Sequence, residues 1–374
     1  MNFDLSSEQN ILKESAHKLL AHHCTSDMVR EMAGSGKGVS SKLWNTMADL
    51  GWMSLLTPEA YGGSGVNPLD LALILYEMGY HCLASPFFAT VVMGGAAVLE
   101  AGNEDQKQTI LPLVADGKIK LSLAWLETAG TYAPEGIQLA AVKDNQGYVL
   151  TGTKLFVPDA AAADRIICAA RTSDAKEGLS LFMVDATAPG VEMTRLDTLG
   201  DDRQYEVAFD HVRVPGSNLL GPLDRAWPIL DKILLQASVA KSAEMCGGAY
   251  RVMDMVIPYA KGRKQFGKPI GAFQAIQHHC ANMLTFAETM KYLAFQAAWR
   301  MTTGLPCAME AAICKAWASD AYGKLVALGH QVVGGVGFME EFDLQLFFRQ
   351  AKAAELLFGD AVFHRERVAQ AMDL

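Results

Sequence analysis

The sequence predicts an α+β protein of three domains: an N-terminal helical domain, a small central antiparallel β-barrel, and a C-terminal four-helix bundle. Three observations predict this order. Apolar residues recur at helical spacing over 1–120, short alternating runs fill 121–225, and long helical runs follow over 226–374. With 374 residues, the chain is also too long for one ordinary hydrophobic core, which favours several domains.

The N-terminal domain is expected to be helical from its first segment. Ser6-Ser7-Glu8-Gln9 is a helix-start signal placed before a series of apolar residues. The Pro and Gly content of TPEAYGGSGVNP predicts a loop, after which LDLALILYEMGY and FATVVMGGAAVLEAG resume the helical pattern. The domain is expected to close with NEDQKQTILPLVADGK.

The pattern changes at about Leu121, where short alternating or β-branched runs begin. These runs include LSLAWLE, DRIICAART, LSLFMVDA, VEMTRLD and YEVAFDHVRVP. Turn residues such as Asn145-Gln146-Gly147 separate them. Several short strands at regular spacing are typical of an antiparallel barrel or sandwich, and we expect a small barrel here.

The C-terminal part returns to long helical patterns. The predicted helices cover about 226–262, 272–303, 306–330 and 345–372. Gly304-Leu305-Pro306 and the glycine-rich stretch at 334–337 interrupt the pattern. Four long helices with short links predict an antiparallel bundle.

The charge and composition exclude several classes of partner. The net charge of −9 disfavours nucleic acid or an anionic membrane surface as the main partner. No uncharged apolar run is long enough to predict a membrane span. Hydrophobic residues make up 51% of the chain, which large buried interfaces between subunits would explain.

The cysteines and histidines give no indication of a metal site. There are seven cysteines and no CxxC pair, which favours reduced thiols in a cytoplasmic protein. His278-His279-Cys280 is a tempting cluster, but adjacent helical residues point to different faces. The N-terminus also lacks the basic and apolar regions of a secretory signal, which again favours the cytoplasm.

One corner between two predicted helices has an unusual composition. Arg263-Lys264-Gln265-Phe266-Gly267 places a cation, an amide and an aromatic ring in one turn. Arg263 offers a planar fork of donors that suits a pyrophosphate. On its own it could equally be a solvated cation at a helix C-terminus, where the dipole favours positive charge.

With the predicted layout, five segments of the sequence resemble the acyl-CoA dehydrogenase family over essentially the whole chain. The segments, from the N-terminus, are MADLGWMSLLTPEAYGGSG, HVRVPGSNLLGP, RKQFG with Gln274 after it, QVVGGVGFMEEF, and RQAKAAELLFGD. Any one of them would be a weak signal. Their order over most of the chain makes the resemblance specific.

The resemblance implies a cofactor, a substrate and an assembly. In this family FAD lies between the β domain and the C-terminal bundle, and the subunits form a dimer or a dimer of dimers. The Arg-x-x-Phe-Gly turn of one subunit reaches the adenosine-diphosphate end of the FAD that its neighbour holds. The implied FAD-binding residues of that corner are Arg263, Gln265, Phe266, Gln274, Gln331, Gly334 and Gly335. The substrate would be an acyl-CoA, and the electron acceptor an electron-transferring flavoprotein.

The residue that should remove the substrate proton is absent from both family positions. Most members use the Glu of a Tyr-Glu-Gly-Thr segment, whose place is taken by Phe358. Other members place the base on the first bundle helix, where this chain has Ala237. Glu244 and Asp360 are the nearest acids, and we regard both as weak candidates. Their alternative roles are an interface acid for Glu244 and a capping or surface acid for Asp360.

The central domain departs from the family pattern as well. The family's Thr-Glu-Pro segment has Leu126 in place of the threonine that bonds the flavin, and Tyr132 in place of a small serine. In the family's Trp-containing segment, Phe156 could still stack on the ring. Pro158 has lost the hydroxyl and the N–H that would face the flavin.

Three hypotheses therefore remain for the function. The first is a non-catalytic subunit of a heteromeric α2β2 enzyme, which contributes to the FAD site of a Glu-bearing partner and serves a bulky substrate such as a steroid acyl-CoA. The second is a homo-oligomeric FAD enzyme with a non-standard base or altered chemistry. The third is a flavin-free scaffold that keeps the fold and pairs with another subunit.

Overall fold

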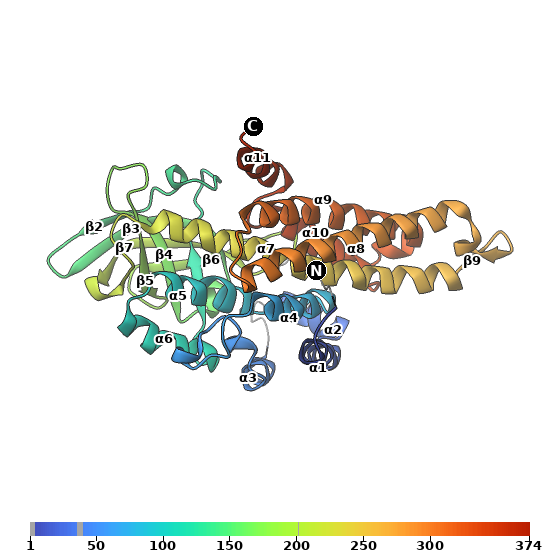
Figure 1. Ribbon diagram of the computed structural model, residues 1–374, viewed down its shortest axis with the longest axis horizontal. Helices are drawn as coiled ribbons and strands as arrows, with labels where there is room; N and C mark the ends of the chain where they lie inside the picture. Colours follow the sequence, from blue (N-terminus) through green and yellow to red (C-terminus); the bar gives the residue numbers. More distant parts are fainter. Residues whose placement is uncertain (1–3, 36–39, 201) are drawn as a thin grey trace.

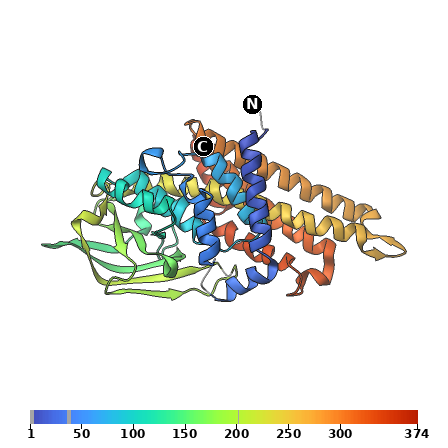
Figure 2. The ribbon, with the colours of Figure 1, turned by 90° about the horizontal axis from the view of Figure 1, so that it is seen from below.

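The structure, a computed structural model, describes residues 4–35, 40–200 and 202–374 of the chain. The molecule is elongated, with a β-sheet at one end and long helices extending to the other (Figure 1). The N-terminal helices lie along one side of both parts, as the view from below shows (Figure 2). The predicted order of helical, sheet and helical regions is confirmed, whereas the boundaries at 120/121 and 225/226 stay predictions.

The N-terminal region is helical, as predicted. Its helices are α1 (Ser7–His23), α2 (Ser26–Ser35), α3 (Ser41–Asp49), α4 (Pro68–Tyr80), the π-helix η3 (Phe88–Gly95), α5 (Ala96–Ala101) and α6 (Glu104–Ala115). The predicted start of α1 is a capping box, in which Ser6 and Gln9 satisfy each other's backbone N–H groups. Asn67 caps α4, and Pro68 occupies its first turn, where no backbone donor is needed.

The central region is a single sheet. Its strands are β1 (Leu121–Ala124), β2 (Ala140–Lys143), β3 (Gly147–Pro158), β4 (Arg165–Arg171), β5 (Leu179–Asp185), β6 (Val191–Arg195), β7 (Gln204–Pro215) and β8 (Leu219–Leu220). The strand order is β6-β7-β3-β2-β4-β5-β8, with β1 paired to β4. One face carries its own apolar core, which includes Leu150, Phe182 and Phe209.

The prediction of a closed antiparallel barrel is wrong in two respects. The described strands form an open path from β6 to β8, and these two edges do not pair with each other. In addition, β4 runs parallel to β1 and β2. The joint between the two halves of the sheet is also narrow, since β2 and β4 pair only at Ala140 and Arg171. Alternating patterns reveal strands but not whether the edges meet, so the sequence could not decide this point.

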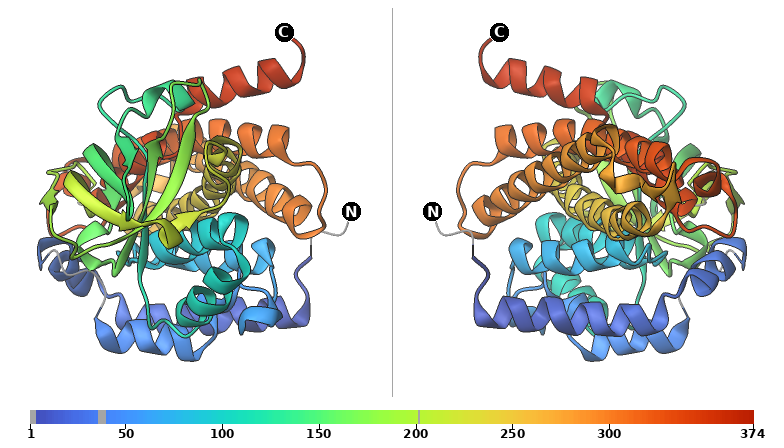
Figure 3. Two further views of the ribbon diagram at one scale, coloured as in Figure 1. Left: turned by 90° about the vertical axis from the view of Figure 1, so that its left-hand side faces the viewer. Right: turned by 90° about the vertical axis from the view of Figure 1, so that its right-hand side faces the viewer.

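The C-terminal region contains five α-helices rather than the four predicted. They are α7 (Ala226–Gly262), α8 (Gln274–Thr302), α9 (Ala308–Val333), α10 (Leu344–Leu356) and α11 (Ala361–Ala371). The first four helices pack together. The last helix, α11, contacts α9 and projects from the bundle (Figure 3). Although α7 has 37 residues, none of the described helices is apolar enough over a sufficient length to cross a membrane.

The predicted helix over 345–372 is broken at Phe358 and Gly359. Their φ angles are 62° and 93°, in the left-handed region where an α-helix cannot continue. Asp360 then starts α11, because its side chain accepts a hydrogen bond of 2.8 Å from the backbone N–H of Phe363. The apolar pattern continues across the break, which is why periodicity alone predicted one helix.

Two glycines allow α4 and α7 to approach each other closely. A Cβ atom at Gly247 would lie 1.8 Å from the carbonyl oxygen of Tyr76, and one at Gly79 would lie 1.9 Å from that of Glu244. Both contacts involve backbone, so no side-chain rotation could relieve them. This crossing fixes the middle of α7 against the N-terminal helices, and it thereby positions one wall of the cleft described below.

Candidate functional site

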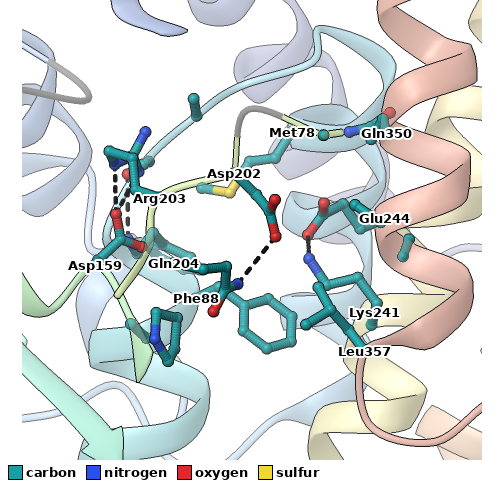
Figure 4. Close-up of a pocket in the computed structure, with 18 of the residues that line it drawn as sticks. Met78, Phe88, Asp159, Asp202, Arg203, Gln204, Lys241, Glu244, Gln350 and Leu357 are labelled. Carbon is teal, nitrogen blue, oxygen red and sulfur yellow. Dashed lines mark hydrogen bonds and ion pairs between the residues drawn. The ribbon is translucent and has the colours of Figure 1, made fainter. Parts of the chain in front are cut away.

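A largely apolar cleft lies where the N-terminal helices, the sheet and the bundle meet (Figure 4). Phe88 comes from η3, Leu126 from the segment after β1, and Pro158 from the end of β3. Lys241 comes from α7, and Phe358 from the break after α10. All three parts of the chain therefore contribute to one cavity.

An aromatic pair forms at Phe358, the residue that the family resemblance aligned with the catalytic Glu. Phe358 is only 7% exposed and stacks on Phe88, with ring centroids 5.4 Å apart and planes 21° apart. The ammonium of Lys241 lies 4.3 Å from the centroid of the Phe88 ring, a cation–π contact. Neither ring can accept a proton, so this wall of the cleft has no general base.

The segment that carries Phe358 is held by buried donors. Lys315 on α9 has no exposed surface and donates to the carbonyl oxygens of Gly359 at 2.8 Å and Glu355 at 3.1 Å. His364 donates from Nε2 to the carbonyl of Phe358 at 2.8 Å. Burial lowers the pKa of Lys315 to about 7 and that of His364 to about 4, so His364 is neutral near pH 7.

The lowered pKa of Lys315 predicts a pH-dependent stability. Between about pH 7 and the ordinary lysine value of 10.5, the unfolded chain holds a proton that the folded chain has lost. The stability that this group contributes therefore rises with pH in that window. In urea unfolding, wild type should gain about 2 kcal/mol relative to Lys315→Met between pH 7 and 9. Lys324→Met, on the exposed side of α9, should follow wild type; equal pH dependence in all three chains would contradict the prediction.

The two weak candidates for a replacement base lie in different places. Glu244 lines the cleft and forms an ion pair of 2.8 Å with Lys241, with both side chains less than 20% exposed. Asp360 does not line the cleft, because its carboxylate caps α11. The other family position, Ala237, is fully buried within α7 and offers no titratable group. Of the two candidates, only Glu244 therefore places its carboxylate in the cavity, which Asp159 and Asp202 also line.

Three residues on the sheet side of the cleft have apolar side chains without a hydrogen-bond donor. Leu126, Phe156 and Pro158 all line it, as the sequence predicted for this wall. Pro158 has no N–H to donate, and its carbonyl oxygen accepts a hydrogen bond of 2.5 Å from Ser122 Oγ. Phe156 has a φ of 52°. Its side chain is 47% exposed, so its ring presents an apolar surface.

The structure also reveals charged cleft residues that sequence reasoning missed. Asp159 and Arg203 form a buried ion pair beside Pro158, with Arg203 Nε donating to Asp159 Oδ1 at 2.6 Å. These residues are 44 positions apart, so their spacing gave no signal. Lys241 could have been noticed, because it interrupts an apolar run on α7 three residues before Glu244.

The Arg263 corner forms a hairpin at the far end of the bundle from the sheet (Figure 1). Strands β9 (Lys264–Gln265) and β10 (Lys268–Pro269) flank a turn of Phe266 and Gly267, whose φ angles are 53° and 79°. Two positive φ angles are typical of a type I′ turn. Phe266 is 90% exposed and Arg263 is also exposed, so the turn displays both side chains to a partner.

The remaining corner residues lie at the same end of the bundle, because α8 starts after the hairpin and α9 returns beside it. Gln274, Gln331 and Gly335 are exposed. A Cβ atom at Gly334 or Gly335 would meet nothing within 4 Å, so this backbone is open to a ligand. The structure thus brings these predicted residues to one end, separate from the cleft residues Leu126, Phe156 and Pro158.

The corner and the cleft are well separated within one chain. Glu244 in the cleft and Arg263 at the corner are 19 residues apart along α7. At the helical rise of 1.5 Å per residue, this corresponds to about 28 Å. A ligand held at the exposed corner would therefore lie far from the cleft of the same chain.

Comparisons with known proteins agree over the whole chain. The model of the acyl-CoA dehydrogenase N-terminal domain matches residues 6–118, that of the middle domain 122–212, and that of the C-terminal domain 227–372. The chain is 31% identical over 382 residues to the probable acyl-CoA dehydrogenase YngJ of Bacillus subtilis, with 99% of each protein covered.

Two solved structures are similar in fold and sequence. One is the Tcur3481–Tcur3483 steroid ACAD, with a TM-score of 0.87, 29% identity and 98% of each chain covered. The other is the ChsE4–ChsE5 complex of Mycobacterium tuberculosis, with a TM-score of 0.90, 25% identity, and coverage of 100% of this chain and 99% of the other. This chain therefore belongs to the acyl-CoA dehydrogenase family, whose cofactor is FAD.

Proposed function

We propose that this chain is the non-catalytic subunit of a heteromeric acyl-CoA dehydrogenase. It pairs with a Glu-bearing member of the family and lends the Arg263 corner to the FAD that this partner holds. The observation that carries the proposal is the Phe358–Phe88 pair, which occupies the place of the catalytic base. The exposed corner, about 28 Å away along α7, supports a division of labour between two chains.

The cleft of this chain is a poor fit for the polar ring of FAD. A flavin ring needs donors at its nitrogen and oxygen atoms, and the side chains of Leu126 and Pro158 provide none. The carbonyl of Pro158 is already engaged by Ser122. The buried guanidinium of Arg203 is engaged by Asp159. These features support a ring site on the partner rather than in this cleft.

The corner, in contrast, fits the pyrophosphate end of the cofactor. Arg263 would pair with phosphate oxygens through its planar fork. Phe266 would cover the nucleotide with an aromatic face, and the open backbone at Gly334 and Gly335 would allow close approach. When bound in the assembled enzyme, FAD supplies the acceptor for the hydride from the acyl-CoA.

The proposed assembly is an α2β2 tetramer that acts on a bulky substrate. One similar structure is a complex of two differently named chains, ChsE4 and ChsE5. Another carries a paired name and is a steroid ACAD. They support a steroid or similarly bulky acyl-CoA as substrate, and an electron-transferring flavoprotein remains the proposed electron acceptor.

One observation favours a second candidate, a homo-oligomeric enzyme with its own base. Glu244 places a carboxylate in the cleft, where it pairs with Lys241 at 2.8 Å. A general base must reach the substrate proton within hydrogen-bonding distance. If Glu244 does so, Glu244→Gln should abolish turnover of the chain expressed alone.

Expression of the chain alone and with a partner separates the two candidates. The heteromeric proposal expects a colourless protein alone, and a yellow complex that oxidises acyl-CoA with a dye acceptor after co-expression with a Glu-bearing relative. One FAD per subunit and turnover by the isolated chain would overturn it in favour of the second candidate. A chain that stays without flavin with every partner would indicate a scaffold.

The FAD contribution of the corner can be tested directly in that complex. Arg263→Ala should weaken FAD binding by about 1.5–3 kcal/mol, or roughly 10- to 100-fold, because one charge-assisted bond is lost. The measurement is FAD occupancy of the purified complex at limiting FAD. Lys261→Ala, an exposed cation on the last turn of α7, is the matched control and should keep wild-type occupancy. Equal occupancy in both variants would contradict the role of Arg263.

A further inference from the structure

Three potential metal ligands converge on the outer side of the N-terminal helices. His17 lies on α1, Glu77 on α4, and His81 directly after the last residue of α4. His17 Nδ1 lies 2.8 Å from Glu77 Oε2 and 3.4 Å from His81 Nε2. All three ligand atoms lie within 4.8 Å of one another, the arrangement of a potential ion site. The first two residues are 60 positions apart, so no sequence spacing announces the cluster.

A hydrogen-bond network alone leaves this cluster poorly satisfied. The single Nδ1 atom of His17 faces both a carboxylate oxygen and a second imidazole nitrogen. One proton on that atom can make a good bond with only one of them. The side chain of Glu77 is only 3% exposed, and a cation bound at its carboxylate would stabilise the buried charge. His17 is 47% exposed, which leaves a path for an ion to enter.

We propose that His17, Glu77 and His81 bind a divalent transition-metal ion of the zinc type, with water as the fourth ligand. Imidazole nitrogen and carboxylate oxygen are common zinc ligands, at about 2.0–2.2 Å. In a tetrahedral site such atoms lie about 3.4 Å apart, close to the observed separation of the two histidine nitrogens. Two nitrogen ligands also select against magnesium and calcium, which prefer oxygen.

The protonation of the cluster suits an ion. Burial and the neighbouring His17 lower the pKa of His81 to about 4, so its lone pair is available at neutral pH.

The charged neighbours set limits on the affinity. Lys13 approaches Glu77, and Arg251 approaches His81, so two cations oppose an added positive charge. Arg251 also stacks on Tyr80, whose hydroxyl donates to Asp254 at 2.7 Å. The anions Glu77 and Asp254 offset these cations. The site would join α1 to the end of α4, directly before residues 82–89, most of which line the cleft.

The experiment is a titration of the purified full-length chain with ZnCl2, followed by calorimetry. Wild type should bind one ion. His17→Ala and His81→Ala should each weaken binding at least tenfold. The matched control is His211→Ala, since His211 also contacts a carboxylate, Asp210, but has no second histidine beside it. Equal affinity in all four chains would overturn the proposal and assign the ion to another site, such as the thiols.

A second measurement covers the case in which a variant fails to fold. X-ray absorption of the zinc-loaded wild type should show nitrogen and oxygen scatterers with two imidazoles per ion. A sulfur shell would overturn the proposal, because none of the three residues carries sulfur. Neither result depends on FAD or on a partner subunit, so failure here leaves the proposed function untouched.

Discussion

Gly247→Ala is expected to lower the free energy of unfolding by about 3–5 kcal/mol, a large effect for the addition of one methyl group. The new Cβ would lie 1.8 Å from the carbonyl oxygen of Tyr76 and 2.7 Å from the backbone nitrogen of Tyr80. Backbone atoms cannot rotate away, so α4 and α7 would have to separate. Their separation would expose residues of the shared core, such as Leu75 and Ala243.

Thermal and urea unfolding of the variant would measure this loss. The matched control is Gly323→Ala, on the helix α9, where the new Cβ would meet only Glu355 Oε2 at 3.8 Å. That control should gain roughly 0.5–1 kcal/mol, because alanine is the better helix former. If Gly247→Ala were as stable as wild type, the close crossing of α4 and α7 would be wrong.

Much of the fold could be predicted because local signals determine it. The capping box of Ser6 and Gln9 fixes the start of α1 by short-range hydrogen bonds. The alternating runs after Leu121 correctly predicted strands, because successive side chains of a β-strand point to opposite faces of the sheet. Whether the predicted barrel closes could not be decided in this way, because pairing of the two edge strands joins residues that are distant in the sequence. The break at Phe358 was also missed, because a positive φ at a phenylalanine has no sequence signature.

The candidate site was predictable only as far as the family resemblance reached. It identified Phe358, Leu126, Phe156 and Pro158 as the wall that should meet a flavin and substrate, and the structure places all four on one cleft. It could not identify Phe88, which stacks on Phe358 from a segment 270 residues away in the chain. Such partners emerge only from packing.

Because the cleft and the corner are far apart, the residues in each can be suited to a different role. If the cleft performs no proton abstraction, aromatic and aliphatic residues there are free to pack for stability. The corner holds an exposed phenylalanine at a positive φ, a strained arrangement that is typical of functional sites and fits the proposed contact with a ligand or partner chain. In the proposed enzyme, packing would therefore determine the residues of the cleft, and contact with a ligand or partner would determine those of the corner.

The second large effect is expected at a buried ion pair behind the wall of the cleft. Lys154 Nζ is fully buried and lies 2.6 Å from Glu127 Oε1, with a further bond of 3.3 Å to the carbonyl of Trp125. Glu127→Gln would leave the ammonium without its counter-charge, at a cost of about 3–5 kcal/mol in the free energy of unfolding. Urea unfolding at neutral pH would measure the loss.

The expected loss comes from an uncompensated charge, and this cause can be separated from lost hydrogen bonds. The Glu127 carboxylate also accepts from the backbone N–H groups of Gln138 and Leu139, bonds that a glutamine oxygen can make in part. The double variant Glu127→Gln with Lys154→Met should therefore be more stable than Glu127→Gln alone, because no buried charge is left unpaired. Glu135→Gln removes a similar pair at the surface, with Lys176, and should cause no measurable change. If Glu127→Gln were as stable as wild type, the buried pair of Lys154 and Glu127 would contribute nothing to the stability of the fold.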